Sequence, residues 1–123
     1  MTAYVRHYLR YVWKGQVCAT TADDIQLQAQ ARNVSKEGLH LVFDQVSAQL
    51  IVPLGYVPNP TQPIELDLSI DEPGRKRLLL TAQVRGVRRL AQDAFSFHLE
   101  FVRLGTEVDQ QLTDFIKSLP QES

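Results

Sequence analysis

The chain has 123 residues, of which 44% are hydrophobic and 22% charged, and its formal net charge at pH 7 is -1. This length suffices for one hydrophobic core but not for two, so we expect a single globular domain. The near-neutral charge argues against a surface for long nucleic acid, which needs an excess of Lys and Arg.

Residues 1–14 begin the chain with four aromatic residues set among Arg6, Arg10 and Lys14. The order of these residues fits neither the helical period of 3.6 nor the strand period of two. We interpret the segment as a flexible arm. The alternative is an N-terminal strand that packs its rings on the rest of the domain and leaves its arginines in solvent.

Three strands are expected between residues 15 and 43. Residues 15–21 form a short strand that ends at the turn formers Ala22, Asp23 and Asp24. Residues 25–32 alternate apolar residues with glutamines, which is typical of a half-buried strand. A polar turn follows at residues 33–38, and the alternation resumes through residue 43.

Residues 44–63 give a weaker pattern. The apolar residues 50–54 are compatible with a short strand or with a covering loop. Proline has no N–H to donate to a neighbouring strand. A regular central strand between residues 53 and 63 is therefore excluded by Pro53, Pro58, Pro60 and Pro63.

The second half of the chain predicts three more elements. Residues 64–70 alternate cleanly as a strand, and after a turn at residues 71–74 a long strand is expected at 75–89, with a bend or bulge near Gly86. The last strand has an aromatic inward face made of Phe95, Phe97, Leu99 and Phe101. Residues 106–119 change to helical period, with Thr106 as N-cap, Asp109 at the capping-box position and Pro120 as the stop. About six antiparallel strands and one helix argue for a small closed or nearly closed barrel of mostly β class.

Two short motifs carry the functional prediction. Arg6 and Arg10 form R-x-x-x-R, and Asn33, Ser35 and Gly38 follow further along as N-x-S-x-x-G. In this order, and in a chain of this size, the motifs resemble the PilZ domain, the bacterial receptor module for cyclic di-GMP. The resemblance implies a six-stranded antiparallel β-barrel of the split-barrel type over residues 15–120, with a C-terminal helix at 106–119 packed against it and an arm at 1–14.

The same resemblance assigns roles to the motif residues. Arg6 and Arg10 wrap the cyclic di-GMP from the arm, while Asn33, Ser35 and Gly38 contact it from the barrel. Arginine suits this ligand because its planar fork makes paired hydrogen bonds to phosphate oxygens or to guanine O6 and N7. The weaker candidates for the same site are Arg32, Arg85 and Trp13; for Arg32, a solvated strand end is an equal alternative.

Catalysis finds no support in the sequence. His7, His40 and His98 are not paired at metal-ligand spacing, and alternation places His40 and His98 on the outer surface. There is no nucleophile elbow, phosphate loop or dinucleotide motif. We therefore expect no enzyme activity, no metal and no cofactor. The single cysteine, Cys18, and the lack of an apolar leader or spanning run predict a cytoplasmic protein without membrane insertion.

Three functions are weighed. The leading hypothesis is a receptor and adaptor, in which the arm orders over the dinucleotide and the new surface signals to an unidentified partner protein. The second is a PilZ-fold interaction module that binds no nucleotide. The third is a small barrel that binds single-stranded nucleic acid through Tyr8, Trp13 and the arginines, against which the near-neutral charge counts.

Overall fold

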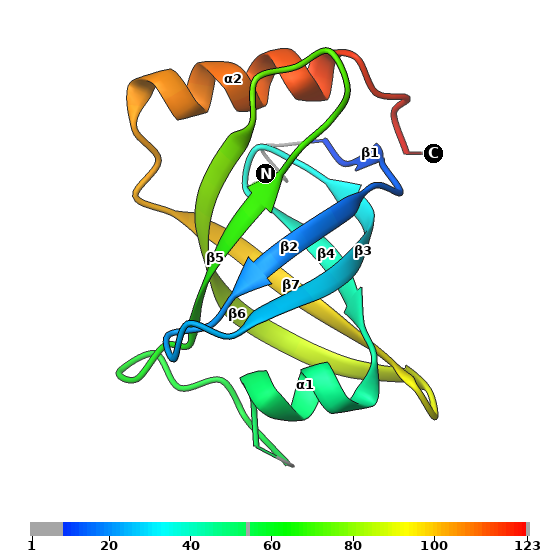
Figure 1. Cartoon of the computed structure of the whole chain (residues 1–123), viewed down its shortest axis with the longest axis vertical. Helices are drawn as coiled ribbons and strands as arrows, with labels where there is room; N and C mark the ends of the chain where they lie inside the picture. The colour runs from blue at the N-terminus through cyan, green and yellow to red at the C-terminus, as the bar shows by residue number, and fades with distance from the viewer. Residues whose placement is uncertain (1–8, 54, 123) are drawn as a thin grey trace, which may run out of the picture.

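Seven antiparallel strands and two helices make up the computed structural model, which describes residues 9–53 and 55–122. In chain order the elements are β1 (Tyr11–Val12), β2 (Gln16–Thr20), β3 (Gln26–Val34), β4 (Gly38–Phe43), α1 (Gln45–Ile51), β5 (Glu65–Ile70), β6 (Leu78–Ala91), β7 (Ala94–Val102) and α2 (Thr106–Lys117). Six of the strands close into a barrel in the order β3, β2, β5, β6, β7 and β4, with β4 pairing back onto β3 (Figure 1). The expected six-stranded antiparallel barrel is confirmed.

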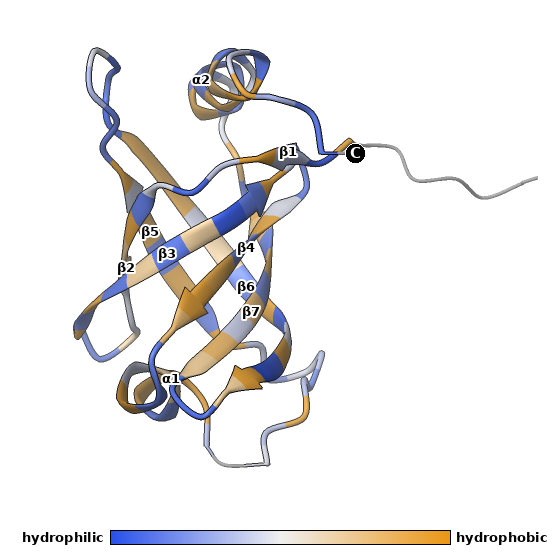
Figure 2. Cartoon of the chain, turned by 90° about the vertical axis from the view of Figure 1, so that its right-hand side faces the viewer, coloured by the Kyte–Doolittle hydropathy of each residue, from blue (hydrophilic) through white to orange (hydrophobic). Residues whose placement is uncertain are grey.

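Alternation along the strands fills the barrel with apolar side chains. Leu27, Ala29 and Ala31 of β3 are buried, and the glutamines between them are exposed. The same period appears in β5 and β7, whose buried residues are Leu66, Leu68, Ile70, Phe97, Leu99 and Phe101. Figure 2 shows hydrophobic and hydrophilic residues alternating along the strands. Burying one such aliphatic or aromatic side chain is worth about 1.5–3 kcal/mol, so this pattern is the main source of stability.

Two strands depart from regular register. β3 carries a bulge between Ala31 and Asn33, so Arg32 is an extra residue that has no pairing partner on β4. β2 pairs with the part of β3 before the bulge and β1 with the part after it. β6 shifts register between Val84 and Gly86, which confirms the irregularity expected near Gly86.

Helix α2 covers one end of the barrel (Figure 1). Its buried side chains are Leu112, Phe115 and Ile116, which are spaced as the helical period predicted for residues 106–119 requires. The predicted N-cap at Thr106 is wrong by one residue, because the cap is Gly105, which makes no side-chain capping hydrogen bond. The helix ends at Lys117, two residues before the expected end.

Helix α1 lies at the opposite end of the barrel (Figure 1). The sequence predicted a short strand or a loop at residues 50–54, and this is wrong for the first two of them, which belong to the helix. The carboxylate of Asp44 accepts from the N–H of Ser47 at 2.8 Å, and the N–H of Gln45 donates to Asp93 at 2.9 Å. These bonds satisfy N–H groups that a helix start leaves open. Among the described residues from 53 to 63 there is no strand, as the prolines predicted.

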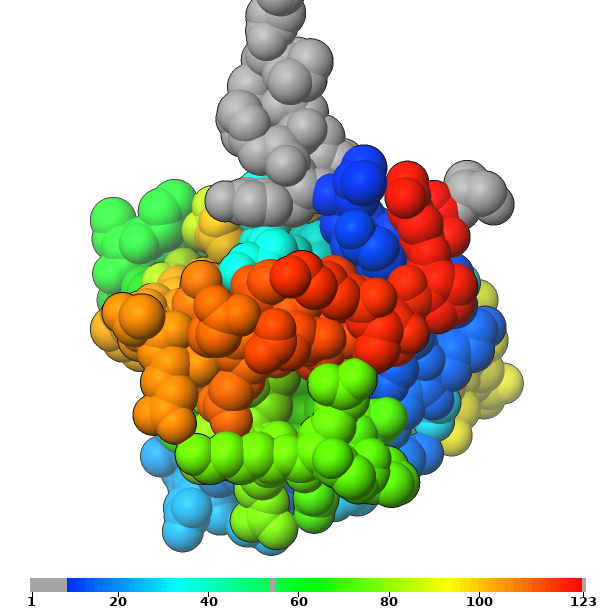
Figure 3. Space-filling view, turned by 90° about the horizontal axis from the view of Figure 1, so that it is seen from above, coloured from blue at the N-terminus to red at the C-terminus, as the bar shows by residue number. Residues whose placement is uncertain are grey.

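The two ends of the described chain meet beside α2. Tyr11 forms a β-bridge with Gln121, and the N–H of Val12 donates to the carbonyl oxygen of Pro120 at 2.8 Å. Figure 3 shows this meeting as the blue segment next to the red one, with α2 running across the same end. Of the expected arm, Tyr11 and Val12 therefore pair with β3 and the C-terminal segment, and Trp13 is buried.

Arg6 and the rest of residues 1–8 lie outside the described residues, and the division of the chain at residue 14 stays a prediction. Neither described helix has the length and apolar character needed to cross a membrane.

Candidate ligand-binding site

Ser35 organises the turn between β3 and β4. Its N–H donates to the carbonyl oxygen of Gly38 at 2.8 Å, and its Oγ accepts from the N–H groups of Glu37 at 3.1 Å and Gly38 at 3.3 Å. The residue is completely buried. A buried hydroxyl with these partners fixes the backbone of the turn, so the neighbouring motif residues are held in place.

At Gly38 the backbone of β4 comes very close to that of β7. A Cβ atom at this position would lie 1.9 Å from the carbonyl oxygen of Leu99. Only glycine allows such a backbone approach. Next to it, the carbonyl oxygen of Glu37 accepts from the N–H of Phe101 at 2.8 Å. The barrel itself therefore requires this motif residue, whatever the turn binds.

Strand pairing places Arg10 against the turn. Tyr11 of β1 pairs with Val34 of β3, so in an antiparallel ladder the preceding residue, Arg10, lies opposite Ser35. The Nε of Arg10 donates to Oδ1 of Asn33 at 2.7 Å, and its Nη1 donates to Oγ of Ser35 at 3.3 Å. The structure thus joins one arginine of the first motif to two residues of the second.

Cations and imidazole rings gather beside Arg10 on the outer surface of the barrel. The rings of His40 and His98 have centroids 4.7 Å apart, and Arg85 of β6 is paired with Glu100 at 3.2 Å. Partial desolvation and the positive charge of Arg10 lower the pKa of His98 below its ordinary value, so its ring is mostly neutral at pH 7. A guanidinium beside a neutral imidazole ring suits a ligand that carries both phosphates and aromatic bases.

Comparison with known families agrees with this geometry. The family model of the PilZ domain matches residues 4–118, which is nearly the whole chain. The chain belongs to the PilZ domain family. No curated protein sequence matches it at a significant level.

Solved PilZ structures share this fold. The PilZ domain of YcgR from Escherichia coli with c-di-GMP gives a TM-score of 0.67 at 15% identity, covering 94% of this chain and 92% of that one. The PilZ domain of CeSA from a cellulose-synthesizing bacterium gives 0.61 at 14% identity, covering 89% and 95%. The inhibitor of motility MotI/DgrA of Bacillus subtilis gives 0.67 at 17% identity, covering 94% of this chain and 51% of that one. At these identities the likeness establishes the fold.

The structure of this PilZ domain brings together four of the five main residues predicted for the site. Arg10 bonds to Asn33 and Ser35, and Gly38 closes the same turn. Arg6 lies outside the described residues. Within the described part of the chain, no group of three or more His, Cys, Asp or Glu side chains is placed to hold a metal ion.

The three weaker candidates for the site differ in their exposure to solvent. Arg32 is exposed at the bulge of β3, and Arg85 is half-exposed on β6. Trp13 is only 6% exposed, and its ring packs edge-on against Phe115 of α2 with centroids 5.0 Å apart. Trp13 is therefore a core residue, and its ring is not on the surface where it would cover a base.

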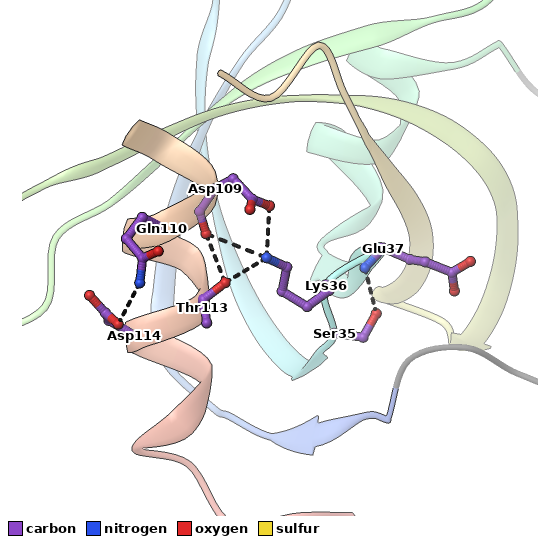
Figure 4. A network of polar contacts seen from close by, with 7 residues as sticks. All are labelled: Ser35, Lys36, Glu37, Asp109, Gln110, Thr113 and Asp114. Atoms are coloured by element: carbon purple, nitrogen blue, oxygen red, sulfur yellow. Dashed lines mark hydrogen bonds and ion pairs between the residues drawn. The ribbon is translucent and has the colours of Figure 1, made fainter. Parts of the chain in front are cut away.

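Sequence reasoning missed the link between the PilZ turn and helix α2. The ammonium group of Lys36 donates to Oδ1 of Asp109 at 2.7 Å and to Oγ1 of Thr113 at 2.6 Å (Figure 4). The Lys36 side chain is 24% exposed, so water screens the ion pair only in part. A lysine between Ser35 and Gly38 gave no signal of this partner, because Asp109 is 73 residues away.

An acidic residue of the C-terminal segment also reaches the site. The N–H of Glu122 donates to the carbonyl oxygen of Arg10 at 3.0 Å, and its carboxylate accepts from the amide of Asn33 at 3.5 Å. This contact places a negative charge at the margin of the Arg10 surface. An anionic ligand that approaches Asn33 meets this charge as well as the guanidinium.

Proposed function

We propose that this PilZ domain is a receptor for cyclic di-GMP. The observation that carries the proposal is the contact of Arg10 with Asn33 and Ser35, which assembles both sequence motifs on one surface. Further support comes from the similar PilZ domain of YcgR, which was solved with c-di-GMP.

The chemistry of the surface matches the two functional groups of this dinucleotide. A guanidinium binds phosphate oxygens, or the O6 and N7 edge of guanine, through two parallel hydrogen bonds. Arg10 is already held beside the turn by Asn33, so little side-chain freedom is lost when a ligand binds. The buried Ser35 keeps the turn itself in one conformation.

The proposal includes a switch. Arg6 adds a second guanidinium from the arm, the arm orders over the bound dinucleotide, and the changed surface is recognised by a partner protein. A ligand shifts such an equilibrium only by binding one arm state more tightly than the other, so the arginines determine both affinity and signal. In this role the domain is a receptor rather than an enzyme.

The alternative is a PilZ-fold interaction module that binds no nucleotide. The observation in its favour is Glu122, whose carboxylate lies beside Asn33 where an anionic ligand is proposed to bind. In that case the surface around Arg10 contacts a protein directly.

Calorimetric titration with cyclic di-GMP tests the proposal. We expect saturable binding by the wild-type chain and a loss of about 10- to 100-fold in affinity for Arg10→Ala, since charged hydrogen bonds contribute about 1.5–3 kcal/mol. Arg10→Lys keeps the charge but not the fork, so it is expected to restore only part of the affinity.

Arg77→Ala is the matched control, because this arginine is exposed and pairs with Asp71, away from the turn. Circular dichroism and thermal unfolding establish that each variant is folded. A folded wild-type chain that gives no binding heat at several temperatures refutes the receptor and leaves the interaction module.

A further inference from the structure

A row of four residues crosses the outer face of the barrel, starting at the motif. Asn33 of β3 pairs with His40 of β4, His40 pairs with His98 of β7, and His98 pairs with Gly86 of β6. Residues paired in this way project to the same face of a sheet, on strands about 4.8 Å apart. The three side chains point outward, since the residues next to them in sequence are completely buried, namely Val34, Leu39 and Leu99.

The row has rings in its middle and open space at its end. The imidazoles of His40 and His98 meet edge to face, at 67°. His40 is half-buried and His98 is exposed. Among the residues that the structure describes, a Cβ atom on Gly86 would meet nothing within 4 Å, so the position beyond His98 carries no side chain and no described group fills the space. This leaves the His98 ring accessible from the side of β6.

The surroundings of His98 favour a neutral ring, mainly through desolvation. Arg10 from the segment before β1 and Arg85 from β6 oppose its protonation, whereas Glu37 from the turn and Glu100 from β7 favour it. Desolvation is the largest influence and also opposes protonation. A neutral imidazole is a flat aromatic surface, and purine bases stack on such surfaces in nucleic-acid sites of many kinds.

We infer that His40 and His98 extend the candidate site from Asn33 across β4 and β7, and that His98 stacks on a guanine base lying over Gly86. The inference rests on the proposed function and deepens it, because it assigns a place on the barrel to a base while Arg10 holds the phosphate side of the ligand. His40 acts through His98, because its ring contacts the stacking ring from the neighbouring strand.

Titration of the folded variants with cyclic di-GMP tests the stacking surface. His98→Ala is expected to lose about tenfold in affinity, and His98→Phe, which keeps a flat ring, is expected to stay within about threefold of the wild type. Gly86→Leu places a side chain where the base would lie and is expected to lose at least as much as His98→Ala. Ser96→Ala, two residues along β7 on the same outer face, is the matched control and is expected to bind like the wild type.

A spectroscopic measurement separates stacking from a structural role. In the proton NMR spectrum the Cε1–H resonance of His98 is expected to move upfield when cyclic di-GMP saturates the wild-type chain, because the base ring current shields it. Normal binding by the wild type together with unchanged affinity in His98→Ala overturns the stacking surface alone. Absence of binding by the wild type overturns the receptor proposal and, with it, this inference.

Discussion

Replacing Gly38 with alanine tests whether this motif glycine serves the barrel. The added Cβ would lie 1.9 Å from the carbonyl oxygen of Leu99 and 2.9 Å from its carbonyl carbon. Both atoms belong to the backbone of β7, so no side-chain rotation relieves the clash. Contacts under 3.0 Å are essentially never observed for Cβ atoms, so β4 and β7 must separate by more than an ångström.

The cost follows from that separation. Hydrogen bonds near 2.9 Å stretch beyond their normal range, including the 2.8 Å bond from the N–H of Phe101 to Glu37. Each lost bond costs about 1 kcal/mol, and overpacking adds about 1–3 kcal/mol of strain. We expect Gly38→Ala to lower the free energy of unfolding by about 3 kcal/mol and the melting temperature by about 10 °C.

Thermal and urea unfolding followed by circular dichroism measure this change. Gly86→Ala is the matched control, since a Cβ there meets none of the described residues within 4 Å, and its stability is expected to stay within about 1 kcal/mol of the wild type. If the two glycine variants have the same melting temperature and urea midpoint, the argument that β4 and β7 require a glycine at position 38 is wrong.

Three further predictions follow from the site. Lys36→Met removes the bonds to α2 and keeps the aliphatic stem, so the free energy of unfolding should fall by about 1 kcal/mol; an unchanged urea midpoint, equal to that of the control Lys117→Met, contradicts it. Glu122→Gln removes a negative charge beside Asn33, so calorimetry should show affinity for cyclic di-GMP rising about two- to fivefold; equal or weaker binding argues against the charge effect. Because the pKa of folded His98 lies below its ordinary value, the unfolded chain takes up that proton first, and stability should fall as pH decreases through about 6.5 toward the folded pKa. Thermal unfolding between about pH 7.5 and 5 measures this loss, and an identical slope in His98→Gln would exclude His98 as its source.

Much of the barrel is predictable because its strands are buried on one face only. In β5, in β7 and in the part of β3 before its bulge, every second residue is apolar and buried or partly buried, and this period identifies both the strand and its inward side. Helix α1 was not predicted, because its start depends in part on Asp93, a residue of the β6–β7 turn that accepts a hydrogen bond from the N–H of Gln45. Seven residues give too short a window for the helical period, although Asp44 three positions before Ser47 was a local capping signal.

The candidate site is predictable in its residue types but not in its connections. The order of the motifs named Arg10, Asn33, Ser35 and Gly38, because each residue type has a recognisable role in the turn or toward an anion. The opposition of His40 and His98 depends on the register of two strands far apart in sequence, and register is fixed by the closed barrel. Trp13 shows the limit most clearly, since the same aromatic ring fits a surface clamp or a core contact until α2 is placed.

The bulge of β3 affects the pairing of the strand with its neighbours but not the pattern of its buried residues. If Arg32 were deleted, Ala31 would still face inward, Asn33 would still face outward and Val34 would still face inward, so the core would keep its pattern. The extra residue, Arg32, therefore adds no side chain to the core. It lengthens β3 between the part paired with β2 and the part paired with β1, and so it affects where β1, with Arg10 before it, lies relative to β2. We expect a deletion of Arg32 to keep the inward pattern of β3 and to move β1, next to Arg10, relative to β2.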